Sequence, residues 1–267
     1  PPPPFFYHPP PGSPHSVASR GLGDVYKRQT LFPGMFGGPL DDSIIGRARE
    51  NKIIEIFLHD LRHYAGDNHR TVDSPPFGGG AGMLLMPGPL FEAVDQVSSQ
   101  TEGESRTIAM SASGRPLSEE VVADLIGCPN LILVCGRYEG MDERFLQNKV
   151  HDEISVGDFV VSGGELPAMV LIDVLARQLE GVLGSSDSLR EESFGAGLLE
   201  YPQYARPANY EGWEVPSVLL SGNHAKIARW REMKSLERTI QRRPDLLTDI
   251  AFAKSQLENM YKEFADD

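Results

Sequence analysis

The sequence has few cysteines, no long hydrophobic run and no common phosphate-binding motif. Cys128 and Cys135 are the only cysteines among 267 residues, and no His or Asp cluster stands near them. A disulfide framework and a cysteine-based metal site are therefore not predicted, and both thiols are expected to be buried in a reducing compartment. No apolar stretch is long enough to span a bilayer and nothing resembles a signal peptide, so we expect a cytoplasmic protein with no membrane partner.

The chain also lacks an excess of basic residues. Its formal net charge of −13 argues against indiscriminate nucleic-acid binding, although net charge does not exclude a local basic patch. The length is enough for one large domain or two ordinary ones with a full hydrophobic core.

The first 29 residues differ from the rest. Eight of the first fourteen are proline, which donates no backbone hydrogen bond, so an extended and solvated tail is expected. Residues 21–29 read like a translated cloning or assembly junction. We expect residues 1–29 to be a disordered tail outside the functional protein; a proline-rich ligand for a partner is the alternative.

Strand and helix patterns alternate from Thr30 onward. The stretch TLFPGMF is typical of a strand that ends in a turn, DDSIIGRAREN of a helix, and KIIEIFLHDL of a second strand. Further on, LILVC is a fully apolar strand of the kind buried on both faces, and ELPAMVLIDVLARQL is a helix with proline in its first turn. The alternation predicts an α/β domain with a mainly parallel sheet over residues 30–180.

Glycine and small polar residues follow three of the predicted strands, at 110–112, 136–140 and 156–164. Ligands of such sheets bind beyond the carboxyl ends of the strands, so these loops predict a small-molecule cleft. The glycines of 78–82 match neither GxGxxG nor GK[ST], and the loop is interpreted as backbone that approaches a flat ligand, or as a plain flexible loop. Asp73 before it would accept hydrogen bonds from a base edge or cap a turn.

Six segments together carry a family resemblance, and they follow one another with matching spacing over residues 30 to about 247. They are TLFPGMF, HRTVD…PFGGGAGM, LILVCGRYEGMDER, EISVGDFVVSGGELPAM, ESFGAGLLEYPQYARP and VLLSGNHAKIARW. This set resembles the bacterial tRNA (guanine-N1)-methyltransferase family, TrmD, of the knotted SPOUT superfamily.

The resemblance implies a fold, a reaction and partners. The fold is an α/β trefoil-knotted, mainly parallel sheet with helices on both faces, followed by a small C-terminal helical domain. The reaction is S-adenosyl-L-methionine-dependent methylation of N1 of the guanine immediately 3′ of the anticodon, position 37, in tRNA. The partners are the tRNA anticodon arm and a second copy of the chain, in a homodimer with a shared active site. The family also suggests Mg²⁺, although the residues show no metal-ligand pattern.

The cofactor residues implied by the resemblance lie on the three glycine-containing loops. Glycines let the backbone touch adenine and ribose, and apolar side chains form the walls. The implied cofactor-binding positions are Met110, Ser111, Ala112, Gly136, Tyr138, Glu139, Gly140, Val156, Gly157, Phe159, Val161, Gly163, Gly164 and Pro167.

The chemistry requires a general base and a positive group. Guanine N1 carries a proton near neutral pH, so a carboxylate must remove it while a cation stabilises the anion that develops. Arg177 matches the family's arginine; its other interpretation is an exposed helix pair with Asp173. The family has aspartate before Ser-Phe where this chain has Glu192, which is the predicted base, with Glu191 as the competitor if the loop shifts by one residue.

The last third of the chain is predicted to bind tRNA. Residues 181–197 are rich in Gly and Ser and are expected to be a flexible linker carrying the base, followed by a helical domain at 198–267. Seven Lys or Arg against two Glu between His224 and Arg243 predict phosphate contacts, with a solvated helix face as the alternative. The implied tRNA-binding residues are Asp73, Gly82, Arg206, His224, Lys226 and Arg229, while Trp230 fits either RNA contact or a core position.

Two other functions are alternatives for this sequence. One is another knotted RNA methyltransferase, acting on ribose 2′-oxygen or on ribosomal RNA, which needs no base at guanine N1. The other is a non-catalytic RNA-binding module, which needs neither the cofactor loops nor Arg177.

Overall fold

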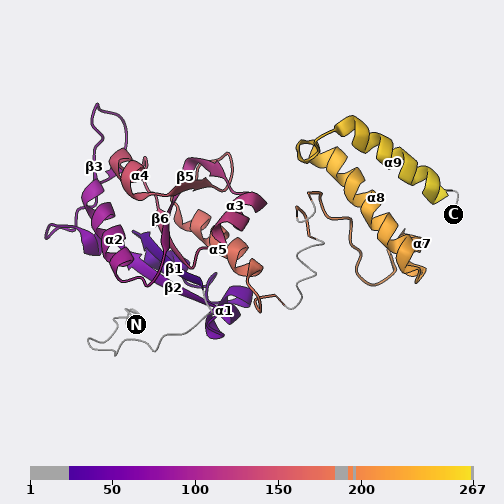
Figure 1. The fold of residues 1–267 in the computed structure, drawn as a ribbon, viewed down its shortest axis with the longest axis horizontal. Coiled ribbons are helices and arrows are strands. Elements are labelled where there is room, and N and C mark those ends of the chain that lie inside the picture. The colour runs from indigo at the N-terminus through magenta and orange to yellow at the C-terminus, as the bar shows by residue number, and fades with distance from the viewer. Residues whose placement is uncertain (1–23, 184–191, 195–196, 266–267) are drawn as a thin grey trace. The chain divides into compact units, whose positions relative to one another are not determined.

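The computed structural model describes residues 24–183, 192–194 and 197–265, which fall into two compact units divided between Val182 and Leu183. The first unit is built on a five-stranded parallel sheet (Figure 1). Its strand order is β2-β1-β6-β5-β7, with β1 at Asp24–Thr30, β2 at Ile54–Asp60, β5 at Ser105–Pro116, β6 at Asn130–Cys135 and β7 at Asp152–Ser155. The predicted α/β class and mainly parallel sheet are confirmed.

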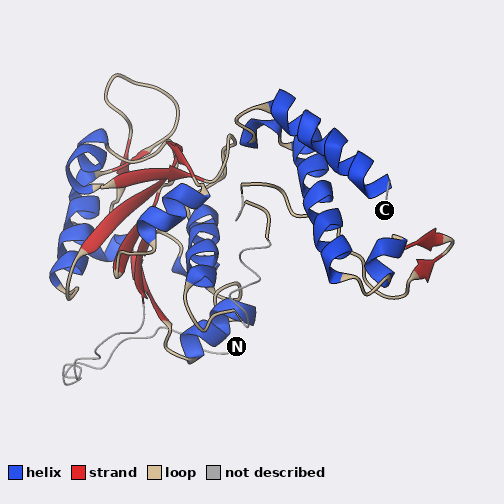
Figure 2. Ribbon diagram, turned by 45° about the vertical axis from the view of Figure 1, so that its right-hand side comes forward, coloured by secondary structure: helices blue, strands red, loops and turns tan. Residues whose placement is uncertain are grey.

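Helices cover both faces of this sheet (Figure 2). The central strand β6 is buried along its whole length: Leu131, Leu133 and Cys135 belong to one hydrophobic core, and Ile132 and Val134 to a second core on the other face. This alternation follows from the two-residue period of a strand. The first core packs α1 (Ser43–Glu50), α3 (Glu119–Leu125) and α5 (Glu165–Gln178); the second packs α2 (Pro87–Ser99) and α4 (Glu143–Lys149).

Short elements join the layers of the first unit. Proline at the first position of α2 and the Ser118 side chain at the start of α3, which accepts a hydrogen bond from Val121 N, begin those helices. The remaining elements are the 3₁₀ helices η1 (Pro33–Phe36) and η2 (Leu61–Tyr64), and an antiparallel hairpin of β3 (Asp73–Ser74) with β4 (Leu84–Leu85).

The amino-terminal boundary of the domain requires a correction. Strand β1 begins at Asp24, inside the segment 1–29 that composition sets apart, and pairs with β2 on one side and β6 on the other. Backbone pairing with two neighbouring strands does not depend on an alternating apolar pattern. The strand at 24–29 is therefore not predicted from its own sequence. Residues 1–23 lie outside the described part of the chain.

The second unit contains helices and one small hairpin. The long helix α8 (His224–Arg242) starts at Asn223, whose side chain accepts a hydrogen bond from Lys226 N, and it packs against α9 (Ile250–Ala265) through buried side chains that include Met233 and Ala253. The other elements are β8 (Asn209–Tyr210), β9 (Trp213–Glu214), α7 (Ser217–Leu220) and η3 (Pro244–Leu246). Within the described ranges of both units, no helix is long and apolar enough to cross a membrane.

One buried amide in the central sheet has no partner. The side chain of Gln29 is 1% exposed, and neither its Oε1 nor its Nε2 atom makes a hydrogen bond. A polar group buried in this way costs about 1–3 kcal/mol. Gln29 is therefore a weak point of β1.

We predict that Gln29→Leu stabilises the protein by about 1–3 kcal/mol, because it removes an unsatisfied amide and keeps a side chain of similar size. Urea unfolding followed by circular dichroism measures the change. Gln96→Leu, at an exposed site of α2, is the matched control and should change stability by less than about 0.5 kcal/mol. A destabilised Gln29→Leu would contradict the packing described for β1.

Candidate active site

A cavity of about 490 Å³ lies at the carboxyl ends of β5, β6 and β7. All fourteen cofactor-binding positions implied by the sequence, from Met110 to Pro167, line this one cavity. They come from a bend within β5 and from the loops after β6 and β7, which lie at the same edge of the parallel sheet. The structure thus brings together residues up to 57 positions apart (167 − 110).

Close backbone contact between two of these loops shapes the cavity. Gly164 N donates a hydrogen bond of 2.8 Å to Gly136 O, and Arg137 forms a β-bridge with Gly163. A Cβ atom on Gly164 would lie 2.8 Å from Cys135 Cα and from Gly136 N. Only glycine fits there without displacing backbone, so the start of α5 rests directly on the end of β6.

A buried ion pair holds the same two loops. Glu165 is fully buried at the start of α5, and its Oε1 accepts hydrogen bonds from Thr30 Oγ1 at 2.7 Å and from Arg137 Nε at 3.2 Å. Its Oε2 lies 3.0 Å from Arg137 Nη2 but outside hydrogen-bonding geometry, so this second contact is electrostatic. The pair joins the end of β1, the loop after β6 and the first turn of α5.

The Arg137 guanidinium makes two further contacts. Its Nη1 donates to Ser162 O at 3.0 Å, and its Cζ lies 4.4 Å from the centroid of the Phe32 ring, a cation–π distance. Although Arg137 lines the cavity, these contacts assign it to holding the loops, with its charge neutralised by Glu165.

The first cavity loop is a bend within β5. The register of β5 against β7 shifts between Met110 and Arg115, so residues 111–114 leave the ladder, and 111–113 line the cavity. At the base of this bend, a Cβ on Gly114 would lie 2.5 Å from Glu153 C, and glycine is again required.

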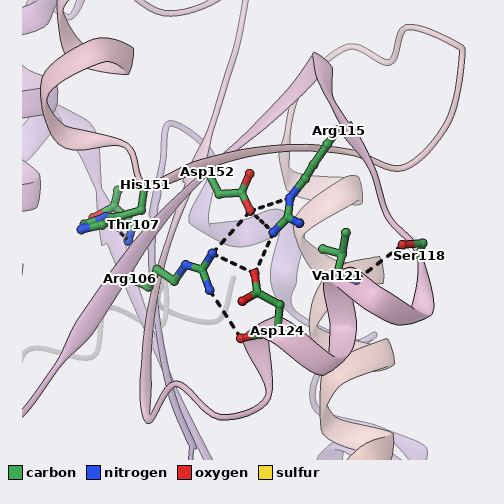
Figure 3. Close-up of polar contacts among 8 residues, drawn as sticks. All are labelled: Arg106, Thr107, Arg115, Ser118, Val121, Asp124, His151 and Asp152. Carbon is green, nitrogen blue, oxygen red and sulfur yellow. Dashed lines mark hydrogen bonds and ion pairs between the residues drawn. The ribbon is translucent and has the colours of Figure 1, made fainter.

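Four charged side chains anchor this bend (Figure 3). Arg115 Nε donates to Asp152 Oδ2 at 2.8 Å and its Nη2 donates to Asp124 Oδ2 at 2.9 Å, while Arg106 Nη2 donates to Asp124 Oδ2 at 2.8 Å. These hydrogen bonds, from Arg106 first and then Arg115, lower the pKa of the Asp124 carboxyl from its usual 3.8 to about 2. The network ties both ends of β5 to α3 and β7.

The β3–β4 hairpin is attached to the second cavity loop, which follows β6. Glu139 N donates to Met83 O and Leu85 N donates to Gly140 O, both at 3.0 Å. Gly82 packs so closely on the Glu139 side chain that a Cβ there would lie 2.5 Å from its Cγ. Asp73, at the other end of the hairpin, pairs with Leu85. Two residues implied in tRNA binding, Asp73 and Gly82, are thus held beside the cavity loop.

The two predicted catalytic residues lie in different units. Arg177 is in the last turn of α5 and is partly buried. Glu192 belongs to the second unit and is also partly buried, next to Ser193, whose Oγ accepts a hydrogen bond from Glu200 N. Residues 184–191, which include the competitor Glu191 and most of the expected flexible linker, lie outside the described residues.

The basic run of α8 is more fully paired than the sequence suggests. Arg229 forms an ion pair with Glu263 of α9, Lys234 pairs with Glu237, and Arg243 pairs with Asp245. Glu237 is already counted in the expected +5 charge, which is reduced further by Glu263 of α9 and Asp245 of η3.

Arg206 lies on the wall of a second cavity of about 620 Å³ in the same unit. In the first turn of α8, His224 is exposed and Lys226 is partly buried. Trp230 is buried, as its core interpretation predicts.

Sequence reasoning missed the residues that hold the site. The missed residues form ion pairs between different segments of the chain, and no local sequence pattern indicates such pairs. They are Arg137, Glu165, Arg115, Asp124 and Asp152. The GRYEG and GGE segments did mark the loops that contain two of them. Across the described residues, no group of three or more His, Cys, Asp or Glu side chains is placed to hold a metal ion.

Comparisons with known proteins agree with one another. The family model described as "tRNA (Guanine-1)-methyltransferase TrmD" matches residues 26–249. A tRNA (guanine-N(1)-)-methyltransferase of Geobacter sulfurreducens is 52% identical over 226 residues, which are 85% of this chain and 92% of the relative. Proteins of the same name from Dehalococcoides mccartyi and Geobacillus kaustophilus are each 49% identical over 85% of this chain, covering 91% and 93% of their own lengths.

We predict that Asp124→Asn lowers the midpoint of thermal unfolding at pH 7 and that the deficit shrinks in acid. The pKa of the folded state lies below the unfolded value of about 3.9, so the ionised contacts stabilise the fold above that pH and this contribution is lost as the pH falls to about 2. Calorimetry of the parent protein and of Asp124→Asn at pH 7 and pH 3 measures the difference between their unfolding midpoints. A deficit equal at both pH values would contradict the assignment, and Glu104→Gln, at an exposed site, is the control.

Proposed function

This chain belongs to the tRNA (guanine-1)-methyltransferase family, and we propose that it transfers the methyl group of S-adenosyl-L-methionine to N1 of the guanine immediately 3′ of the anticodon, position 37, in tRNA. It is an enzyme of tRNA methylation. The observation that carries the proposal is the convergence of all fourteen implied cofactor positions on one cavity. The alternatives, another knotted RNA methyltransferase or a non-catalytic module, are not favoured by relatives that share one name over most of the chain.

The cavity suits the proposed cofactor in size and chemistry. Its volume of about 490 Å³ lies in the range of small-molecule sites. Val156, Phe159 and Val161 supply apolar walls, and glycine backbone at 136, 140 and 157 offers close N–H and C=O groups. Bound S-adenosylmethionine supplies an electrophilic methyl group on a sulfonium that departs as a neutral thioether.

Two side chains of this protein carry the proton chemistry in the proposal. The Glu192 carboxylate removes the N1 proton of guanine, so that the nitrogen lone pair attacks the methyl group. The Arg177 guanidinium stabilises the negative charge that develops toward the purine carbonyl oxygen. No step runs through Mg²⁺, because the described residues offer no cluster that fits it.

We also propose that the first unit is threaded as a trefoil knot, the form that the family implies. The chain at 162–165 returns to the loop after β6, with the Gly164–Gly136 hydrogen bond and the Arg137–Glu165 pair between them. This return of the chain to an earlier loop supports the proposal.

A homodimer with a shared active site is the proposed assembly. Phe159, Val160 and Val161 of the cavity loop and Leu166 and Val170 of α5 expose large apolar side chains next to the cavity. Apolar side chains gathered in adjoining segments favour burial against another protein surface. A second copy over this face completes the site from both chains. We place the enzyme in the cytoplasm, with its tRNA substrate, and its C-terminal helical unit against the anticodon arm.

The proposed function is tested by methyl transfer to an unmodified tRNA transcript that bears guanine 3′ of its anticodon. Mass spectrometry of nuclease fragments locates the methyl group and distinguishes N1 of the base from the ribose 2′-oxygen. A matched tRNA with adenine at that position is the control and should remain unmethylated. Methylation of the control, or of ribose, would refute the proposal.

For the cofactor site we predict that Gly164→Ala raises the Kd for S-adenosylmethionine by about tenfold or more. The added Cβ pushes the start of α5 away from Cys135 and Gly136 and misplaces the cavity loops. Isothermal titration calorimetry measures the Kd. Gly88→Ala is the control, because a Cβ there meets open space on α2, and equal Kd values for both variants would rule out this placement of the cofactor.

For the base we predict that Glu192→Gln lowers kcat by roughly 10²- to 10⁴-fold, as expected for loss of a general base. Glu192→Asp, which introduces the family's residue, should stay within about tenfold of the parent. Cofactor Kd should not change in either variant.

Glu191→Gln is the matched control for this prediction, because it removes the neighbouring carboxylate. Arg177→Ala should lose turnover while it still binds cofactor. Full activity of Glu192→Gln, together with an inactive Glu191→Gln, would transfer the role of base to Glu191.

A further inference from the structure

The most exposed large apolar side chain among the described residues is Phe77, which is 98% exposed. It lies in the loop between β3 and β4, which stands out from the body of the first unit beside β3 (Figure 1). Single exposed apolar residues are common on protein surfaces and mean nothing by themselves. The position of Phe77 is what requires an explanation.

Both ends of this loop are tied down beside the cavity. The loop leaves and re-enters a hairpin in which Asp73 pairs with Leu85, and Met86 N donates to Val72 O at 2.8 Å. Met83 accepts the hydrogen bond from Glu139 N, so the base of the loop is joined to the cavity-lining loop 136–141. Phe77 therefore lies on a loop whose base is attached to the cavity-lining loop 136–141.

The immediate neighbours of Phe77 leave its ring uncovered. Pro75 and Pro76 precede it and stiffen the backbone, while Gly78, Gly79 and Gly80 follow it with φ values of +87°, +81° and +132°. A Cβ on Gly78 or Gly79 would meet no atom within 4 Å, so there is open space next to the ring. Because three glycines without side chains follow Phe77, its ring presents a flat face with open space beside it.

A flat ring in open space fits a nucleobase better than a protein surface. A stable protein contact buries a patch of many apolar side chains, and the neighbours of Phe77 supply only the small rings of Pro75 and Pro76. A base needs only one planar partner, since stacking uses the face of the ring. An enzyme that reacts with the Watson–Crick edge of a base must also draw that base out of its stack and replace the lost stacking.

We propose that Phe77 stacks on the guanine that is methylated and holds it at the mouth of the cavity while N1 faces the methyl donor. This inference rests on the proposed function and adds to it a residue that selects and positions the unstacked purine. The loop backbone at 78–80 follows the base edge, and Phe77 supplies the stacking face.

The first test compares Phe77→Ala, Phe77→Leu and Phe77→Trp in the full chain. Loss of stacking on one base should lower kcat/KM for tRNA by about 5- to 150-fold in the Ala and Leu variants, and Trp should restore it. Leu retains apolar bulk without a planar face, so it separates stacking from simple burial. The Kd for S-adenosylmethionine should not change in any variant.

The second test observes the base directly. A tRNA with 2-aminopurine in place of the target guanine should show quenched fluorescence when it binds the parent protein or Phe77→Trp, and markedly less quenching with Phe77→Ala. Phe57→Ala, an exposed phenylalanine on the edge strand β2, is the matched control and should quench like the parent.

Three results would overturn the inference. They are a kcat/KM for Phe77→Ala within twofold of the parent, a raised cofactor Kd that points to stacking on adenine, or a loss of activity that sedimentation traces to dissociation of the dimer. If the parent protein methylates no tRNA, the proposed function fails, and the fluorescence measurement still decides whether Phe77 stacks on a bound base.

Discussion

The buried pair of Arg137 and Glu165 is the interaction on which the cavity depends. Glu165 is fully buried and receives Arg137 and Thr30 from segments 28 and 135 residues away. Removing one partner of a buried pair leaves an uncompensated charge, at a cost of about 3–5 kcal/mol. Neither residue therefore has much freedom, and the three segments that meet at the pair are fixed together. The cavity loops on either side of the pair are therefore held in place as well.

Glycine and charge act in complementary ways around the cavity. Gly164 and Gly114 allow backbones to approach more closely than any side chain permits, which brings the loops together without filling the cavity. The Arg137–Glu165 pair and the Arg106–Arg115–Asp124–Asp152 network then hold those loops in place. Tight backbone contact shapes the site, and ion pairs at its edges keep that shape. This arrangement leaves the apolar side chains of the cavity wall and the glycine backbone groups available to a ligand.

The sequence predicted the cavity more fully than it predicted its supports. Glycine and small residues after strands have a local cause, since backbone must turn there and approach a ligand, so 110–112, 136–140 and 156–164 were recognisable in advance. Arg137, Glu165 and Asp124 act through partners that only the folded chain brings near, and single-sequence patterns do not contain that information. The same limitation affected the basic run on α8: the acid that neutralises Arg229 comes from Glu263 on α9. Strand β1 was missed because two neighbouring strands, and not its own side-chain pattern, determine it.

The division of the chain after Val182 has a consequence for the proposed chemistry. The cavity and Arg177 belong to the first unit, whereas Glu192 belongs to the second, where Ser193 and Glu200 are hydrogen-bonded and Arg238 Nη1 donates to Glu200 O at 2.9 Å. The segment just after Glu192 is therefore anchored to α8, the helix that carries most of the basic residues. A carboxylate fixed to the proposed RNA-binding unit moves with that unit and not independently of it. In the proposed mechanism, binding of tRNA to α8 and delivery of the base to guanine N1 are therefore one event, and proton removal depends on the correct substrate.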